Sequence, residues 1–345
     1  MSQQASHYYA LALQIRCHTV NRLTVGDARA RILDNIERIK RSIAASRAFI
    51  GPDCSFVVTG EYSLTGFPAG ESVPEWREKA CLEMDGPEYE RLSKVAQSQG
   101  IYLAGNAYEI DPHFPELYFQ TCYLIAPSGD VVLRYRRLIS MYTPSPHDVL
   151  DKYLDIYGAD GLFPVARTDI GRIAGTASEE ILYPEIVRAF ALRGAEVIFN
   201  STSEAASPDT VKQCARRVRA VENLIYVIGA NSGGYGDSAI PQNSVDGNSD
   251  IVDYRGQVLA QAGYGESMVA YAEVDLDALR RFRRRPGLPN TLSRLRLDLF
   301  QDQYRQTVYP ANSWLRDGEV KVGSARDFYN TQQRVMEALA ERGVI

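Results

Sequence analysis

Apolar and polar positions follow two different periods along the chain. From residue 25 to residue 49, apolar residues recur every three or four positions, which predicts a helix with one buried face. Short apolar runs predict buried strands at 8–17, 55–59, 101–107, 118–126, 131–135, 196–200, 224–230, 248–253, 258–263 and 268–274. Further helices are predicted at 87–99, from Pro184 onward, at 208–223 and at 326–342.

The order of these elements predicts the fold class. Strands alternate with helices over most of the chain, which favours an α/β fold. In two places several strands follow one another directly, which indicates two sheets packed face to face with helices outside. The stretch 143–161 contains two prolines and is predicted to be a long irregular loop.

The domain organisation follows from where the pattern changes. No linker rich in Pro, Gly or Ser divides residues 1–289, so we expect one domain there. Residues 290–345 are too few for a core of their own. We therefore expect this C-terminal extension to pack on the domain or on a partner subunit, using the aromatic residues Phe300, Tyr304, Tyr309 and Trp314.

Composition narrows the class of protein. The chain has 345 residues, of which 45% are hydrophobic, and a net charge of −5. These values suit a globular protein with a sizeable core and argue against a nucleic-acid surface, which needs a basic stripe. The basic run at 281–285 is interpreted as a solvated helix end.

Three sequence features indicate where the protein is located and whether it needs a cofactor. The five cysteines are scattered and odd in number, which favours reduced thiols in a cytoplasmic protein. The four histidines show no metal-ligand spacing, so we expect neither a metal nor another cofactor. No signal peptide or membrane-length apolar run is recognised, so no membrane partner is expected.

A strand-to-helix turn at Ser178 is the first candidate for chemistry. An apolar strand at 171–177 precedes it, and a helix is predicted from Pro184. A side chain at such a turn is held by the sheet and faces the cleft at its end, where α/β enzymes place nucleophiles. The alternative is a helix-capping serine. The residues around Ser178 do not form a Gly-x-Ser-x-Gly motif.

Two other charged residues also follow predicted strands. Glu61 comes directly after the strand 55–59, where a carboxylate must be paired or face a cleft, unless it is a capping or surface residue. Arg137 ends the basic run after the strand 131–135. Basic residues at a strand end are more often solvated, so each residue alone is a weak signal.

Taken together, the three segments resemble the Glu-Lys-Cys triad of the nitrilase, or carbon-nitrogen hydrolase, superfamily. Glu61 fits the glutamate position, although Gly60 stands where the family carries proline. Arg137 stands where lysine is expected, after Tyr135-Arg136, and Ser178 stands where cysteine is expected. Weaker matches continue through 183–256, and the resemblance covers roughly residues 8–289.

The resemblance implies a four-layer αββα sandwich that forms a homodimer or larger homo-oligomer. It implies cleavage or formation of amide- or nitrile-type C–N bonds of small molecules without metal or cofactor. By resemblance, Glu61 is the base, Arg137 stabilises the oxyanion and Ser178 is the nucleophile. Many members carry a second glutamate in the loop after the lysine. The corresponding loop here offers His147 and Asp148, and the choice between them stays open. The substrate-binding candidates are Glu179, Tyr62, Tyr183, His147 and Asn200.

Both departures from the triad change the chemistry. A thiol has a pKa of about 8.5 and is strongly nucleophilic as a thiolate, whereas a hydroxyl is far less acidic. Arginine stays charged and cannot deliver a proton as lysine can. Three interpretations stay open: a divergent hydrolase or acyl-transfer enzyme, an inactive relative that binds a small molecule or a partner, and a Cys-to-Ser trapped amidase or nitrilase. The trapped variant would explain Ser178 but not Arg137.

Overall fold

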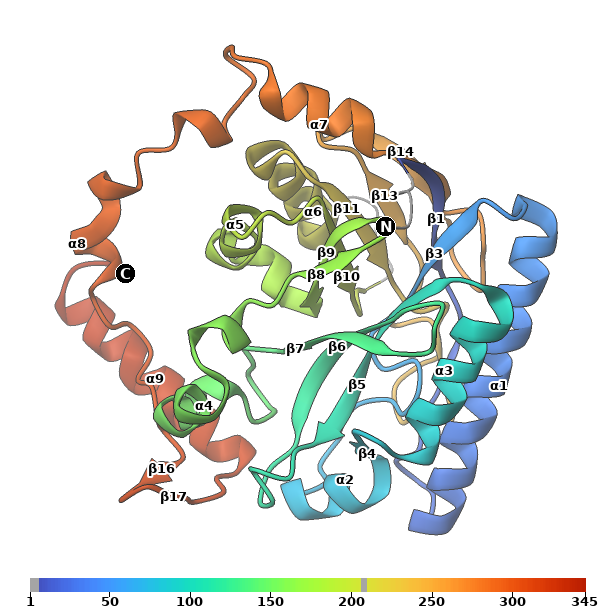
Figure 1. Cartoon of the computed structure of the whole chain (residues 1–345). Coiled ribbons are helices and arrows are strands. Elements are labelled where there is room, and N and C mark those ends of the chain that lie inside the picture. The colour runs from blue at the N-terminus through green and yellow to red at the C-terminus, as the bar shows by residue number, and fades with distance from the viewer. Residues whose placement is uncertain (1–5, 206–209) are drawn as a thin grey trace.

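Two β-sheets packed face to face form the centre of the molecule (Figure 1). The computed structural model describes residues 6–205 and 210–345. The first sheet comprises β1 (His7–Leu13), β3 (Cys54–Thr59), β4 (Leu82–Glu83), β5 (Tyr102–Ile110), β6 (Phe119–Ile125), β7 (Val131–Arg136) and β15 (Tyr271–Asp275). The second comprises β8 (Ala166–Thr168), β9 (Gly171–Ala177), β10 (Val197–Ser201), β11 (Tyr226–Ala230), β13 (Asp250–Val252) and β14 (Val258–Gln261).

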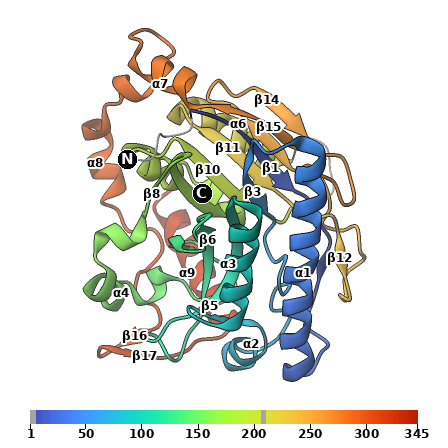
Figure 2. The same cartoon turned by 45° about the vertical axis from the view of Figure 1, so that its right-hand side comes forward.

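Helices cover the outer face of each sheet, which gives the expected αββα sandwich (Figure 2). On the first sheet lie α1 (Val25–Ile50), α2 (Val73–Ala80) and α3 (Pro87–Gln99). On the second lie α5 (Pro184–Leu192) and α6 (Val211–Asn223). The α1 helix forms where its apolar period predicts, because Ile32, Ile36, Ile39 and Ile43 all face the sheet and are fully buried.

The parallel strands end at one edge of the sandwich. In the second sheet β9, β10 and β11 are parallel, with Ser201 level with both Ala177 and Ala230. The two sheets meet at this edge, because Ser201 Oγ donates to the Thr59 carbonyl at 2.9 Å. Residues just after β3 and β9 are therefore neighbours in space, although more than 100 residues separate them in sequence.

The predicted loop at 143–161 is wrong in part. It contains α4 (Leu150–Tyr157), flanked by 3-10 turns at Pro146–Val149 and Ala159–Leu162. The two prolines lie before the helix rather than inside it, and Pro146 occupies the first turn, where its missing N–H costs nothing. Val149 and Tyr153 bury their side chains in a separate apolar cluster with Phe114 and Phe119.

Other boundaries also differ from the prediction. The first strand ends at Leu13 instead of residue 17, and α2 and β8 were not predicted. The helix expected from residue 208 begins at Val211, and residues 208 and 209 lie outside the described part. Two short pairs complete the strands, β2 (Cys17–His18) with β12 (Tyr235–Gly236) and β16 (Leu315–Arg316) with β17 (Glu319–Val320).

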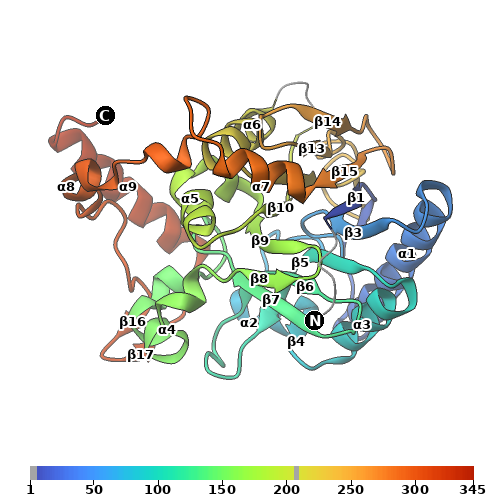
Figure 3. The same cartoon turned by 45° about the horizontal axis from the view of Figure 1, so that its top comes forward.

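The C-terminal segment runs from α7 (Leu276–Arg284) through α8 (Gln301–Tyr304) to α9 (Ala325–Glu341), and Figure 3 shows α7 passing in front of α5 and α6. Trp314 and Phe328 insert into the apolar cluster around Phe114 and Tyr153. This segment has no apolar core of its own among its described residues and is held by the domain. No helix in the described ranges is long and apolar enough to cross a bilayer.

Part of the basic run 281–285 has a structural task instead of facing solvent. Arg283 donates to the main-chain carbonyls of Leu224 at 2.8 Å and Ala195 at 2.6 Å, which ties α7 to the second sheet. Arg281, Arg284 and Arg285 are exposed, as the interpretation of a solvated helix end requires.

Candidate active site

Ser178 occupies a strained turn directly after β9. Its φ of 49° lies in the left-handed region, which costs a non-glycine residue about 1 kcal/mol or more and recurs at functional sites. The Asn200 side-chain amide on β10 donates to the Ser178 carbonyl and to Thr176 Oγ1, at 3.2 Å each. The neighbouring strand therefore holds the turn in place, and the Ser178 side chain is buried with 4% exposure.

Glu180 joins the Ser178 turn to the loop that carries Arg137. Its buried carboxylate accepts hydrogen bonds of 2.7–3.2 Å from the N–H groups of Ala177, Leu138 and Ile139 and from the hydroxyl of Tyr135. Burial raises the pKa of Glu180, while Arg137 and these donors act in the opposite direction. Glu180 is thus a positioning residue that fixes the end of β7 against the end of β9.

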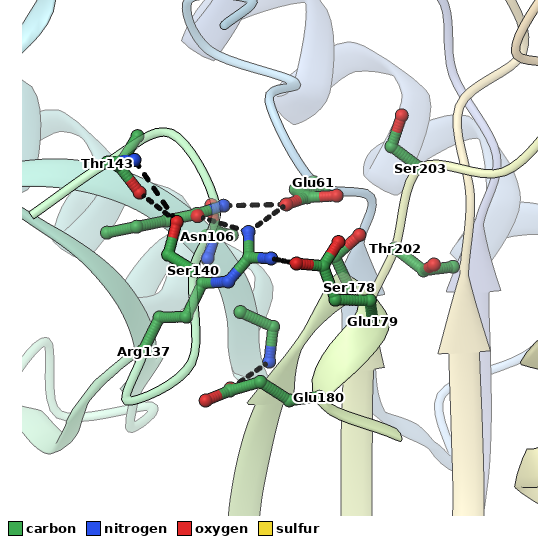
Figure 4. A network of polar contacts seen from close by, with 12 residues as sticks. Glu61, Asn106, Arg137, Ser140, Thr143, Ser178, Glu179, Glu180, Thr202 and Ser203 are labelled. Carbon is green, nitrogen blue, oxygen red and sulfur yellow. Dashed lines mark hydrogen bonds and ion pairs between the residues drawn. The ribbon is translucent and has the colours of Figure 1, made fainter. Parts of the chain in front are cut away.

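Arg137 is held between two carboxylates, Glu61 and Glu179 (Figure 4). Its Nη1 lies 3.4 Å from Glu61 Oε1, its Nη2 forms an ion pair with Glu179, and its Nε donates to the Ile139 carbonyl at 2.7 Å. Gln120 bridges the first pair, since it donates to Glu61 Oε1 at 2.7 Å and accepts from Arg137 Nη1 at 2.8 Å.

Arg137 keeps its positive charge although it is buried. Burial disfavours the Arg137 cation, but the nearby Glu179, Tyr62 and Glu61 outweigh that effect and raise the pKa of Arg137. Glu61 is fully buried, and its Oε2 has no hydrogen-bond partner among the described residues. A buried carboxylate oxygen without a partner can receive a proton or an N–H group from a bound molecule.

The hydroxyl of Ser178 contacts a residue that the sequence analysis missed. Lys212 Nζ lies 2.8 Å from Ser178 Oγ and also donates to the Ser203 carbonyl at 2.7 Å. Within the described residues, the hydrogen bond of Ser178 Oγ is therefore with Lys212, while Glu61 and Arg137 pair with each other. One signal was available: a lysine in the first turn of a helix opposes the helix dipole and needs another reason to be there.

Comparison with known proteins shows the family to which this chain belongs. The family model described as "Carbon-nitrogen hydrolase" matches residues 22–284. The chain belongs to the carbon-nitrogen hydrolase family. Formamidases of Bacillus thuringiensis and Bacillus cereus are each 24% identical over 272 residues, which cover 79% of this chain and 76% of theirs.

Solved structures show the same fold. A carbon-nitrogen hydrolase from Helicobacter pylori superimposes with a TM-score of 0.66 at 20% identity, covering 87% of this chain and 99% of that one. An amidase from Nesterenkonia sp. superimposes with a TM-score of 0.59 at 22% identity, covering 86% and 97%. At these sequence identities, the two superpositions show that the chain shares the fold of these proteins.

A buried ion cluster fixes the helix that carries Lys212. Arg216, one turn further along α6, forms ion pairs with Glu204 and with Asp250 on β13, the latter at 2.6 Å from Nε to Oδ1. All three side chains are buried, and the two carboxylates outweigh the effect of burial and raise the pKa of Arg216. This cluster ties α6 to β13, and Lys212 lies on the same helix one turn before Arg216.

We expect Arg216→Ala to destabilise the fold by about 3–5 kcal/mol, because it leaves two buried carboxylates without their partner. Urea unfolding followed by circular dichroism measures the change. Arg217→Ala is the matched control, since its side chain is exposed and donates to the Gly256 carbonyl at 3.3 Å. An equal loss of stability in both variants would contradict a structural role for the cluster.

Of the predicted substrate-binding residues, some lie at the polar cluster around Arg137 and others lie away from it. Glu179 joins the polar cluster, and Tyr62, with φ 63°, stacks on Tyr108 beside it. Tyr183 is exposed at the start of α5, where partial burial raises its pKa and Glu179 adds to the effect.

Asn200 contacts the main chain of Ser178 and so positions the turn. His147 packs near Tyr309 of the C-terminal segment, and its carbonyl accepts from the Asn312 N–H at 2.9 Å. The polar cluster does not include His147, and substrate binding by His147 stays a prediction. In residues 6–205 and 210–345, no three His, Cys, Asp or Glu side chains form a group that could hold a metal ion.

Proposed function

We propose that this chain hydrolyses an amide-type C–N bond of a small molecule, with Ser178 as nucleophile. The observation that carries the proposal is the buried, strained Ser178, whose hydroxyl contacts an amine beside the Glu61–Arg137 pair. Strain at a strand-to-helix turn is typical of nucleophiles in α/β enzymes. The formamidase and amidase names of the relatives support an amide as substrate.

The proposed reaction has two steps. Ser178 Oγ loses its proton and attacks the amide carbon, and the C=O double bond opens to an oxyanion. The C=O bond then re-forms as the C–N bond breaks, and the nitrogen leaves as an amine with the proton that Ser178 lost, so that an acyl ester remains. Water next attacks the ester and gives a proton to Glu61. The ester C–O bond breaks to release the acid, and Glu61 returns the proton to Ser178 Oγ. Arg137 supplies positive charge near the oxyanion and fixes the Glu61 carboxylate.

Ammonia release from a panel of small primary amides tests this function. Formamide, acetamide and larger amides are incubated with wild type and with Ser178→Ala, and matching nitriles form a second arm. We expect at least one amide to release ammonia with wild type only. Equal release by both proteins, or by neither, would overturn the proposal.

Arg137→Lys should slow turnover only mildly, by about tenfold. A lysine keeps one positive charge beside the oxyanion, but it replaces a planar group that here binds Glu61, Gln120 and Glu179 together. Steady-state kinetics on the best amide measures the change, with Arg137→Met as the variant that removes the charge. If the lysine and methionine variants lose equal activity, the charge of Arg137 has no role in the reaction.

A second function, ligand binding without turnover, is favoured by one observation. The guanidinium of Arg137 already binds two carboxylates, so it must leave one of them to contact a substrate oxyanion. The double variant Ser178→Cys with Arg137→Lys separates the two functions. Covalent trapping of an amide or nitrile by this variant, with binding but no turnover by wild type, would establish the non-catalytic function.

A further inference from the structure

Lys212 meets the Ser178 hydroxyl at the first turn of α6. Its Nζ has three neighbours at hydrogen-bond distance: Ser178 Oγ at 2.8 Å, the Ser203 carbonyl at 2.7 Å and Thr202 Oγ1 at 3.4 Å. We propose that Lys212 is a catalytic residue that takes the hydroxyl proton of Ser178 during attack and passes it to the leaving amine. This inference rests on the proposed function and leaves Glu61 as the base for water.

The three neighbours suit both protonation states of the Lys212 amine. A neutral amine has two N–H groups and one lone pair, whereas an ammonium ion has three N–H groups and no lone pair. An ammonium ion can donate to all three neighbours. A neutral amine can donate to the Ser203 carbonyl and Thr202 Oγ1 and accept the hydroxyl proton of Ser178 in the same positions. Among the described residues, no carboxylate lies within 4.0 Å of Nζ to hold it as a cation.

The surroundings of Lys212 act in both directions. Burial lowers its pKa, and Arg137 adds to this, while the carboxylates of Glu61, Glu204 and Glu179 act to raise it. The positive end of the α6 dipole also disfavours a cation in the first turn. The sum is a pKa below the ordinary value of lysine, so Lys212 gives up its proton more readily than an exposed lysine does.

The proton and the electron pairs balance over the first step. The Oγ–H bond breaks as its proton moves to the Nζ lone pair, and the freed electron pair of Oγ forms the new bond to the acyl carbon. The proton then moves from Nζ to the amide nitrogen as the C–N bond breaks. Lys212 is neutral again when the acyl ester has formed, and the amine leaves with the proton that Ser178 lost.

Acylation of Ser178 by p-nitrophenyl acetate tests this role without knowledge of the substrate. Released nitrophenol gives the rate, and peptide mass spectrometry locates the acetyl group. Lys212→Met should lower the rate at Ser178 by at least about a hundredfold, because it removes the base but keeps a long apolar side chain. Lys79→Met is the matched control, since Lys79 Nζ also donates to a main-chain carbonyl, that of Asn21, at 2.9 Å.

The pH dependence separates a base from a structural lysine. The wild-type rate should rise with pH and level off above the pKa of Lys212, which lies below the ordinary value of about 10.4 for lysine. Lys212→Met should lose this rise. Lys212→Arg, which keeps the charge but cannot release a proton, should stay as slow as Lys212→Met.

Each outcome decides between the proposals. No acetylation of Ser178 in wild type overturns both the proposed function and the role of Lys212. Acetylation of wild type that is unchanged in Lys212→Met, or restored in Lys212→Arg, overturns the role of Lys212 alone. If Lys212→Met does not fold, the wild-type profile still decides, because a rate independent of pH excludes Lys212 as the base.

Discussion

Ser178→Ala should reduce amide turnover by at least about a thousandfold while leaving the fold intact. The hydroxyl is the only atom group removed, and without it no acyl ester can form, so the covalent route is lost entirely. The left-handed backbone at Ser178 is held by Asn200 through main-chain contacts, which alanine keeps. Comparison of kcat/KM for the best amide, together with Tm, measures both parts of this expectation.

The matched control for this change is Ser46→Ala. Ser46 is also buried, and its hydroxyl donates to the Ser42 carbonyl at 2.7 Å inside α1, on the outer face of the first sheet. We expect this control to retain full activity. If Ser178→Ala keeps more than a tenth of the wild-type kcat, water or another side chain attacks the amide, and the nucleophile proposal is wrong.

Glu61→Gln should lower turnover by about a hundred- to ten-thousandfold, the usual contribution of a general base. The amide oxygen of glutamine can still accept the hydrogen bonds from Gln120 and Arg137, so the change mainly removes the proton acceptor. Because Glu61 is proposed to activate water in the second step, the acyl ester should accumulate in this variant. Intact-protein mass spectrometry during turnover measures that accumulation.

Glu109→Gln gives the comparison that this prediction needs. Glu109 is an equally buried carboxylate on β5, paired with Arg134 and bonded to the hydroxyl of Tyr89 at 2.8 Å. Its loss should lower Tm but leave kcat nearly unchanged. A similar fall of kcat in both variants would mean that Glu61 supports the fold and does not act on the substrate.

The sequence predicted those parts of the fold and site that depend on local patterns. The period of apolar residues located α1 and α3 closely, and buried strands were found because each is an apolar run. Glu61, Arg137 and Ser178 could be singled out because each follows such a strand. The helix α4 was missed because two prolines precede it and only one of its residues is fully buried.

The missing site residues depend on contacts between distant segments. Lys212 lies 34 residues after Ser178, and only the packing of α6 beside the β9 turn brings them together. Gln120 lies inside an apolar strand, where nothing in the sequence shows that it bridges Glu61 and Arg137. Contacts of this kind follow from the tertiary fold and not from the period of apolar residues.

The most direct test of the central claim is the site of acylation during amide turnover. Glu61→Gln protein is mixed with the best amide, quenched in acid at short times and digested for peptide mass spectrometry. We expect the acyl mass on the peptide that contains Ser178. We expect no acyl mass on that peptide in the double variant that carries both Glu61→Gln and Ser178→Ala. Ammonia release without an acyl group on Ser178, or with the acyl group on a cysteine, would contradict it.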